Sequence, residues 1–288
     1  MSQGRNRGAI ARLETGSMSL HPPPSVPYAA PSVRPAPALV AVAHGSRDPE
    51  ALPAITALLE LVRSLRPGLR VVPGHIELNE PLLPDTLDAL PAGPAVLVPL
   101  LFGRGYHVKH DIPRAAAAAA HLEIRTAAPL GPHPLLAEAL AARLAEAVPE
   151  GGAPDGVVLA AAGSRDPESA RDAGRTAALL SARLGGVPVL PAYASAAAPT
   201  VPEAVAALRR AGCRRPALAS YFAAPGHFAT RCARAVPELP AAGPLGAHPA
   251  LARLVLHRYD EARARFRAPA RRLRAGRPVP VPAGGPAR

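Results

Sequence analysis

The chain has 288 residues, of which 49% are hydrophobic but only 3% are aromatic, and it contains no Trp. This length exceeds the roughly 150 residues of a usual domain, so we expect two small domains or one large one, with a core of Ala, Leu and Val. The formal net charge of +12 lies mostly at the two ends, because residues 1–37 carry a net +3 and residues 261–288 a net +7. The nearly neutral body argues against a nucleic-acid groove, which would need a basic stripe on the folded domain.

Cysteine usage and hydrophobic runs bear on where the protein works. The two cysteines, Cys213 and Cys232, show no C-x-x-C spacing and offer no disulfide framework, which fits a reducing cytosol. No apolar segment of a signal peptide follows the early arginines, and no run of about 18 apolar residues occurs without Pro or charge. We therefore expect a cytoplasmic protein that neither crosses a membrane nor is secreted.

Strand and helix patterns alternate along the first half of the chain. The Pro-rich segment 1–36 and the Arg- and Pro-rich segment 263–288 are expected to be disordered tails. The ordered body begins with a short apolar run at 37–43, typical of a buried parallel strand. Further apolar runs and helical periodicity predict helices at 49–65, 84–90 and 114–122 and strands at 71–78, 95–101 and 124–128. This order predicts a parallel sheet with helices on both faces.

The second half of the chain repeats the first. Residues 43–50 (Ala-His-Gly-Ser-Arg-Asp-Pro-Glu) recur at 161–168 with one change, an offset of 118. Three further matches keep the same order: 80–81 with 198–199, 105–107 with 225–227, and 129–134 with 244–249. We therefore predict two copies of one α/β unit, at 37–146 and 154–262, joined by the Gly- and Pro-rich segment 149–154. A cleft between the copies is the natural ligand site.

Chemistry-bearing side chains gather at the ends of three successive strands. His44 follows the first strand and His107 follows the third, so both should emerge at the carboxyl edge of the sheet, where open α/β folds bind ligands. Glu77 closes the predicted second strand and adds a carboxylate. Two imidazoles and one acid on the same rim could share a metal ion or a proton.

An anion site is predicted beside His44. Gly45 and Ser46 can present backbone N–H groups and a hydroxyl at the start of a helix, and Arg47 adds a fixed positive charge. Each of these residues, taken alone, also has an ordinary structural explanation, such as a hydrogen-bonded strand-end histidine or a solvated acid. Their joint placement favours a functional site.

The remaining histidines are expected to be solvated or structural. His75, His110 and His121 are assigned to solvated positions. His133 and His248 lie in matching Leu-Gly-x-His-Pro turns of the two copies, which favours a structural role in the turn.

The two copies differ at the positions that matter for chemistry. The second copy has Ala162 and Ser195 where the first has His44 and Glu77. Only the first copy therefore retains the acid–base and ligand set. The second would shape the cleft and offer His227.

Three motifs stand out together: Ala-His-Gly-Ser-Arg at 43–47, Glu77 followed by Pro81, and Pro-Leu-Leu-Phe-Gly-Arg-Gly-Tyr-His-Val-Lys-His-Asp-Ile-Pro at 99–113. As a set they resemble the sirohydrochlorin chelatase family, the class II cobalto- and ferrochelatases of siroheme and cobalamin synthesis, in its long two-unit form. The resemblance spans residues 38–262. It implies an α/β fold of two tandem flavodoxin-like units, each a parallel sheet with flanking helices, facing each other across a central cleft.

The resemblance implies insertion of Co²⁺ or Fe²⁺ into sirohydrochlorin without ATP, a lyase-class metal chelatase reaction. It implies that His44 and His107 bind the incoming metal and accept the pyrrole protons, with Glu77 assisting. The carboxylates of the macrocycle would be held by Gly45, Ser46, Arg47, Arg104 and Lys109. The partners would be the tetrapyrrole and a divalent metal ion, with no permanently bound cofactor, no nucleic acid and no membrane. We expect a monomer, because two fused units already build the cleft.

Three other functions stay open at this point, as does the choice between cobalt and iron. A non-catalytic carrier of a metal or a tetrapyrrole would need the same cleft and histidines. A histidine phosphatase would use His44 as its nucleophile, but such a site wants an Arg immediately before the His, where this chain has Ala43. Nucleic-acid binding through the Arg-rich segment 263–277 would weaken steeply with salt.

Overall fold

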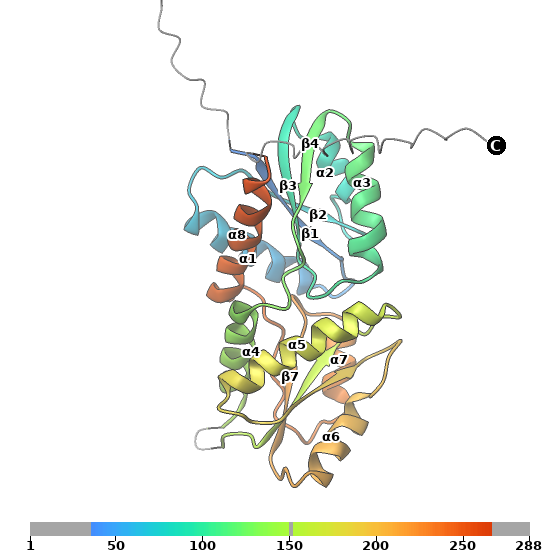
Figure 1. Cartoon of the computed structure of the whole chain (residues 1–288), viewed down its shortest axis with the longest axis vertical. Coiled ribbons are helices and arrows are strands. Elements are labelled where there is room, and N and C mark those ends of the chain that lie inside the picture. The colour runs from blue at the N-terminus through green and yellow to red at the C-terminus, as the bar shows by residue number, and fades with distance from the viewer. Residues whose placement is uncertain (1–35, 150–151, 267–288) are drawn as a thin grey trace, which may run out of the picture. The chain divides into compact units, whose positions relative to one another are not determined.

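The computed structural model describes residues 36–149 and 152–266, which contain two parallel β-sheets flanked by helices (Figure 1). The first sheet has the order β2-β1-β3-β4 and the second the order β6-β5-β7. The strands are β1 (Ala38–Ala43), β2 (Val71–His75), β3 (Gly93–Pro99), β4 (Leu122–Thr126), β5 (Gly156–Ala161), β6 (Val189–Tyr193) and β7 (Pro216–Ser220). The predicted fold, two tandem α/β units with parallel sheets, is confirmed.

The helices follow the strands in the predicted alternation. They are α1 (Ala51–Leu65), α2 (Leu83–Asp88), the π-helical turn η1 (His107–Asp111), α3 (Ile112–Ala118), α4 (Pro134–Ala147), α5 (Pro167–Arg183), α6 (Val201–Arg210), α7 (His227–Arg234) and α8 (Pro249–Ala264). The tails predicted at 1–36 and 263–288 lie almost entirely outside the described residues, and α8 extends two residues into the second of them. Within the described residues, no helix is long and apolar enough to cross a membrane.

The central strands β1, β3 and β5 are apolar throughout because helices cover both faces of each sheet. Along β1, Leu39 and Ala41 contribute to one core cluster, while Val40 and Val42 contribute to another on the opposite face. This alternation explains why the run has no polar face. Among residues 36–149 and 152–266, the second sheet has three strands, and a single parallel bridge between Leu218 and Ala241 stands where the first sheet has its fourth strand.

The last helix of each sequence copy packs on the sheet of the other copy. Helix α8 contacts α1, β3 and β4 of the first sheet, and α4 contacts α5 and β7 of the second (Figure 1). The buried Tyr259 in α8 donates its hydroxyl to Pro37 O at 2.7 Å, and Asp260 accepts two hydrogen bonds from Arg66 in α1. Arg143 in α4 donates in turn to Leu245 O. The repeats at 37–146 and 154–262 therefore do not fold as two separate bodies, since each contributes a helix to the other. The sequence similarity between the copies does not indicate which sheet each helix covers.

One boundary next to the predicted site also differs. Strand β2 ends at His75, so Glu77 does not close it but lies in the following turn. The pairing with β1 nevertheless continues, because Ile76 N donates to Ala43 O and Glu77 N donates to His44 O. Leu78 then adopts a positive φ of 68°, which turns the chain away from the sheet.

Candidate active site

The turn after β1 fixes His44 next to Glu77. Gly45 has φ +103°, and a Cβ atom there would lie 1.8 Å from Glu77 O, so only glycine fits. Ser46 N donates to the side chain of Asn79 at 2.7 Å, which ties the turn to the loop that follows β2. As a result His44 Nε2 lies 3.6 Å from Glu77 Oε1, and both side chains are about half exposed.

His107 opens the π-helical turn η1 after the loop that follows β3. Its Nδ1 lies 2.7 Å from Asp111 Oδ2, and the other oxygen of Asp111 accepts from Arg114. Because a carboxylate only accepts, we infer that His107 Nδ1 carries the hydrogen and that its Nε2 has a free lone pair. A histidine whose second nitrogen is held by a carboxylate is typical of metal ligands.

The two predicted histidines come together as expected. The rings of His44 and His107 are 4.7 Å apart between centroids and nearly perpendicular. His44 Nδ1 lies 3.2 Å from Gly45 O, which again assigns the hydrogen to Nδ1 and leaves Nε2 as the lone-pair nitrogen facing Glu77. His44 Nε2 and Glu77 Oε1 both offer lone pairs and share no hydrogen. A proton or a cation can therefore bind between them.

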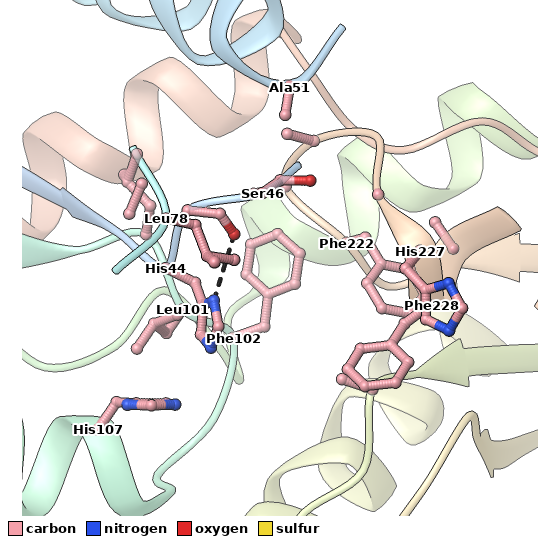
Figure 2. A pocket seen from close by; sticks show the side chains of 18 of the residues that line it. His44, Ser46, Ala51, Leu78, Leu101, Phe102, His107, Phe222, His227 and Phe228 are labelled. Carbon is pink, nitrogen blue, oxygen red and sulfur yellow. Dashed lines mark hydrogen bonds between the residues drawn. The ribbon is translucent and has the colours of Figure 1, made fainter. Parts of the chain in front are cut away.

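These residues line a cavity of about 780 Å³ to which both sequence copies contribute. His44 and His107 lie on one side of it, and Phe222, His227 and Phe228 lie on the opposite side (Figure 2). The expected cleft between the copies is therefore present, and its second-copy wall combines small residues with the aromatic side chains of Phe222 and Phe228. Within the described residues, no group of three or more His, Cys, Asp or Glu side chains is close enough to hold a metal ion as it stands.

Three of the five residues predicted to hold anionic groups line this cavity. They are Gly45, Ser46 and Arg47, and Arg47 is exposed with no ion-pair partner in the part of the chain that the structure describes. Arg104 and Lys109 are not in the cavity lining, contrary to expectation. Their charges are already matched by carboxylates of the second copy, described below.

The structure differs from the sequence-based prediction at several other residues. His75 was expected to be solvated, but it is 3% exposed, with its Nδ1 3.1 Å from Pro81 O. Asp111 and Asn79 contact the site although the sequence predicts no role for them. The His-x-x-x-Asp spacing is the signal for Asp111, because residues four apart share a helix face. The structural role predicted for His133 and His248 is confirmed, since each caps the N-terminus of a helix by accepting a backbone hydrogen bond at 3.1 Å.

The comparison with protein families decides the relationship. A family model described as CbiX matches residues 38–147 and 156–262. The chain belongs to the CbiX family. The match covers both sequence copies and confirms the predicted resemblance to sirohydrochlorin chelatases.

Individual relatives of this CbiX-family protein agree. The chain is 34% identical over 80 residues to a sirohydrochlorin cobaltochelatase of Methanococcus aeolicus, a match that covers 27% of this chain and 56% of that protein. The chain thus spans little more than half the length of this relative. Among solved structures, SirB from Bacillus subtilis with Fe³⁺ is 26% identical, with a TM-score of 0.67 over 81% of this chain and 97% of that one. SirB from Bacillus subtilis subspecies spizizenii in complex with cobalt shares the fold at 24% identity, with a TM-score of 0.62 over 80% of this chain and 96% of that one.

Proposed function

We propose that this protein inserts a divalent metal ion, Co²⁺ or Fe²⁺, into sirohydrochlorin during siroheme or cobalamin biosynthesis, without ATP. The observation that carries the proposal is the pair of imidazoles 4.7 Å apart in a large cavity, each with Nδ1 held by an oxygen. Imidazole suits first-row divalent ions, and membership of the CbiX family supports the same reaction.

In the proposed mechanism, His44 and His107 bind the incoming ion through Nε2. Few protein ligands are an advantage here, because the ion must pass to four pyrrole nitrogens of the macrocycle. Two pyrrole N–H bonds break as the metal–nitrogen bonds form, so two protons must leave. As the ion departs, the two Nε2 lone pairs become free to accept those protons, and Glu77, 3.6 Å from His44, stabilises the imidazolium that results.

The cavity also suits the shape and charge of the macrocycle. The backbone N–H groups of Gly45 and Ser46 and the guanidinium of Arg47 would bind its carboxylates. Phe222 and Phe228, on the opposite wall, would contact its apolar faces (Figure 2). The proposal includes both cobalt and iron, because one SirB structure is described with Fe³⁺ and the other with cobalt.

The test is an anaerobic absorbance assay of sirohydrochlorin with Co²⁺ or Fe²⁺, compared with the uncatalysed rate. We expect multiple turnovers, and we expect His44→Ala and His107→Ala each to lower the rate by about 100-fold or more. His121→Gln is the matched control, because His121 is exposed and is not part of the cavity lining, with its Nε2 3.1 Å from Leu90 O, so this variant should leave the rate unchanged.

Other outcomes would move the protein to another class. A spectral shift of the macrocycle without turnover would indicate a metal or tetrapyrrole carrier. Near-normal turnover in both histidine variants would contradict the proposed site, and no interaction with the macrocycle would contradict the proposed function.

A further inference from the structure

A cluster of five charged side chains connects the loop that carries His107 to the second sequence copy. Arg104 donates to Asp172 at 2.7 Å and to Glu168 at 2.9 Å. Lys109 lies 2.5 Å from Asp166 and 2.7 Å from Glu168. We call these five residues the charge clamp. Its two bases come from the first copy and its three acids from the beginning of α5 in the second.

The Arg104–Asp172 pair is the most buried part of the charge clamp. The Asp172 side chain is fully buried and accepts from Arg104 through the backbone N–H, Nε and Nη2. Burial opposes ionisation of this carboxyl, but the hydrogen bonds from Arg104 hold its pKa below the usual value. A buried carboxylate with three hydrogen bonds to one arginine defines both position and orientation far better than an exposed ion pair.

Two of the three acids of the charge clamp are part of the internal repeat. Asp166 and Glu168 belong to the Ser-Arg-Asp-Pro-Glu segment that also occurs in the first copy, where Asp48 and Glu50 are the counterparts. Asp172 is not repeated, because Ala54 occupies the equivalent position.

The bases, by contrast, are present in one copy alone. When 105–107 is aligned with 225–227, Arg104 corresponds to Ala224 and Lys109 to Ala229. The loop of the second copy is linked to the first by a hydrogen bond from Ser46 Oγ to Pro225 O at 3.4 Å. Charge thus fixes the loop that carries the candidate metal ligand, and its counterpart across the cavity is bound less firmly.

We propose that Asp166, Glu168 and Asp172 are positioning residues for the metal site, acting through Arg104 and Lys109 on His107. His107 lies between the two bases in the chain, and Lys109 is itself part of η1. Fixing the chain on both sides of His107 fixes the position of its Nε2 relative to His44. This gives the second copy, which lacks His and Glu at the equivalent positions, a part in metal binding. The inference rests on the proposed function for its role in the reaction, but metal binding tests it separately.

The experiment measures Co²⁺ binding to the full-length protein without macrocycle, through the visible absorption of the ion. In Lys109→Ala and in Asp166→Asn/Glu168→Gln, we expect the Co²⁺ affinity to fall about tenfold, as for other residues that orient a metal-binding histidine. Combining the two sets of substitutions should add little, because both remove the same contacts. Lys109→Arg should restore most of the affinity.

The matched control is Glu138→Gln, which breaks another ion pair between the copies. Glu138 in α4 pairs with Arg253 in α8 at 2.5 Å, away from the cavity lining. This variant should keep the Co²⁺ spectrum and affinity of the wild type. Asp172→Asn is the most direct variant, but Asp172 is buried, so the partly exposed Lys109 carries the test if Asp172→Asn fails to fold.

Steady-state insertion separates this role from substrate binding. Substitutions in the charge clamp should lower kcat for metal insertion and leave KM for sirohydrochlorin within about twofold of the wild-type value. If Lys109→Ala instead raises KM tenfold with normal Co²⁺ affinity, Lys109 binds the macrocycle and the inference is overturned. If the wild type binds Co²⁺ through His44 and His107 but performs no insertion, the proposed function fails, while the Co²⁺ measurements still decide the positioning role.

Discussion

The turn after the first strand has the same backbone in both sequence copies but carries different side chains. Gly163 repeats Gly45 with φ +91°, and a Cβ atom on it would lie 1.8 Å from Ser195 O, as one on Gly45 would from Glu77 O. In the first copy this close approach places His44 beside Glu77. In the second, Ser195 donates its hydroxyl to Ala162 O at 3.0 Å. The same turn thus places a histidine beside a carboxylate in one copy and forms a hydrogen bond within the turn in the other.

The second copy nevertheless contributes to the structure around the first. It supplies the acids of the charge clamp, the cavity wall that includes Phe222 and Phe228, and helix α8, which covers the first sheet. Duplication of a unit therefore frees one active site to change, while the contacts between the copies remain necessary.

Between the two copies, the largest expected difference in metal insertion comes from substituting the equivalent glycines Gly45 and Gly163. Gly45→Ala and Gly163→Ala should each destabilise the fold by about 1–3 kcal/mol, because both need a left-handed backbone and lack room for a Cβ atom. Only Gly45→Ala moves Glu77 and His44 apart, so it should also lower metal insertion by about 100-fold. Urea unfolding and the insertion assay measure the two effects. Equal activity of the two variants would show that the turns do not differ in function.

A second prediction concerns the exchanged helices. Tyr259→Ala should lower the free energy of unfolding by about 3–5 kcal/mol, because a fully buried aromatic ring is lost. Tyr259→Phe should lower it by about 1 kcal/mol, because only the hydrogen bond to Pro37 is lost. Hydrogen exchange should quicken first in α1, β3 and β4, which α8 contacts. Faster exchange confined to β5–β7 would contradict the exchanged packing.

The sequence predicts those features that local pattern determines. The apolar run of β1, the Gly-Ser turn after it and the internal repeat suffice to place His44 and His107 on one sheet edge, where the structure also has them. The repeat likewise indicates a structural role for His133 and His248 in their turns, and the structure identifies this role as capping of a helix.

Features that depend on the opposite copy could not be predicted. Arg104 and Lys109 lie in a motif beside the candidate ligand, so a substrate role was a reasonable expectation. Their partners are 57–68 residues away in the chain, and nothing local indicates that contact. The burial of His75 and the exchange of α4 and α8 likewise depend on how elements pack, which periodicity alone does not determine.

A third prediction compares the arginines of the two repeated turns. Arg47 and Arg165 are both exposed and have no ion-pair partner within the described ranges, but only Arg47 lines the cavity. Arg47→Ala should raise KM for sirohydrochlorin about tenfold, the effect of losing one charge-assisted hydrogen bond. Arg165→Ala should change it less than twofold. A similar rise in both would mean that the macrocycle extends beyond the cavity lining toward the second copy.

The smallest effect should come from the histidine caps of α4 and α8, which occur in the matching turns of both copies. His133 and His248 accept the backbone N–H of Leu135 and Ala250, which requires an unprotonated Nδ1. Burial is the main cause that lowers the pKa of each imidazole below 6.5, with a nearby arginine adding to it. The unfolded chain therefore binds protons first as the pH falls, so the stability these caps contribute is present above pH 6.5 and is lost below it.

In His133→Asn/His248→Asn, the caps accept the same hydrogen bonds without titrating, so the free energy of unfolding should vary less between pH 7 and pH 5 than in the wild type, by about 1 kcal/mol per cap at most. Unfolding in urea across that range measures the difference. Each single variant should remove about half of it, because the two turns have the same geometry, and an unchanged pH dependence in the double variant would assign the acid sensitivity to other groups.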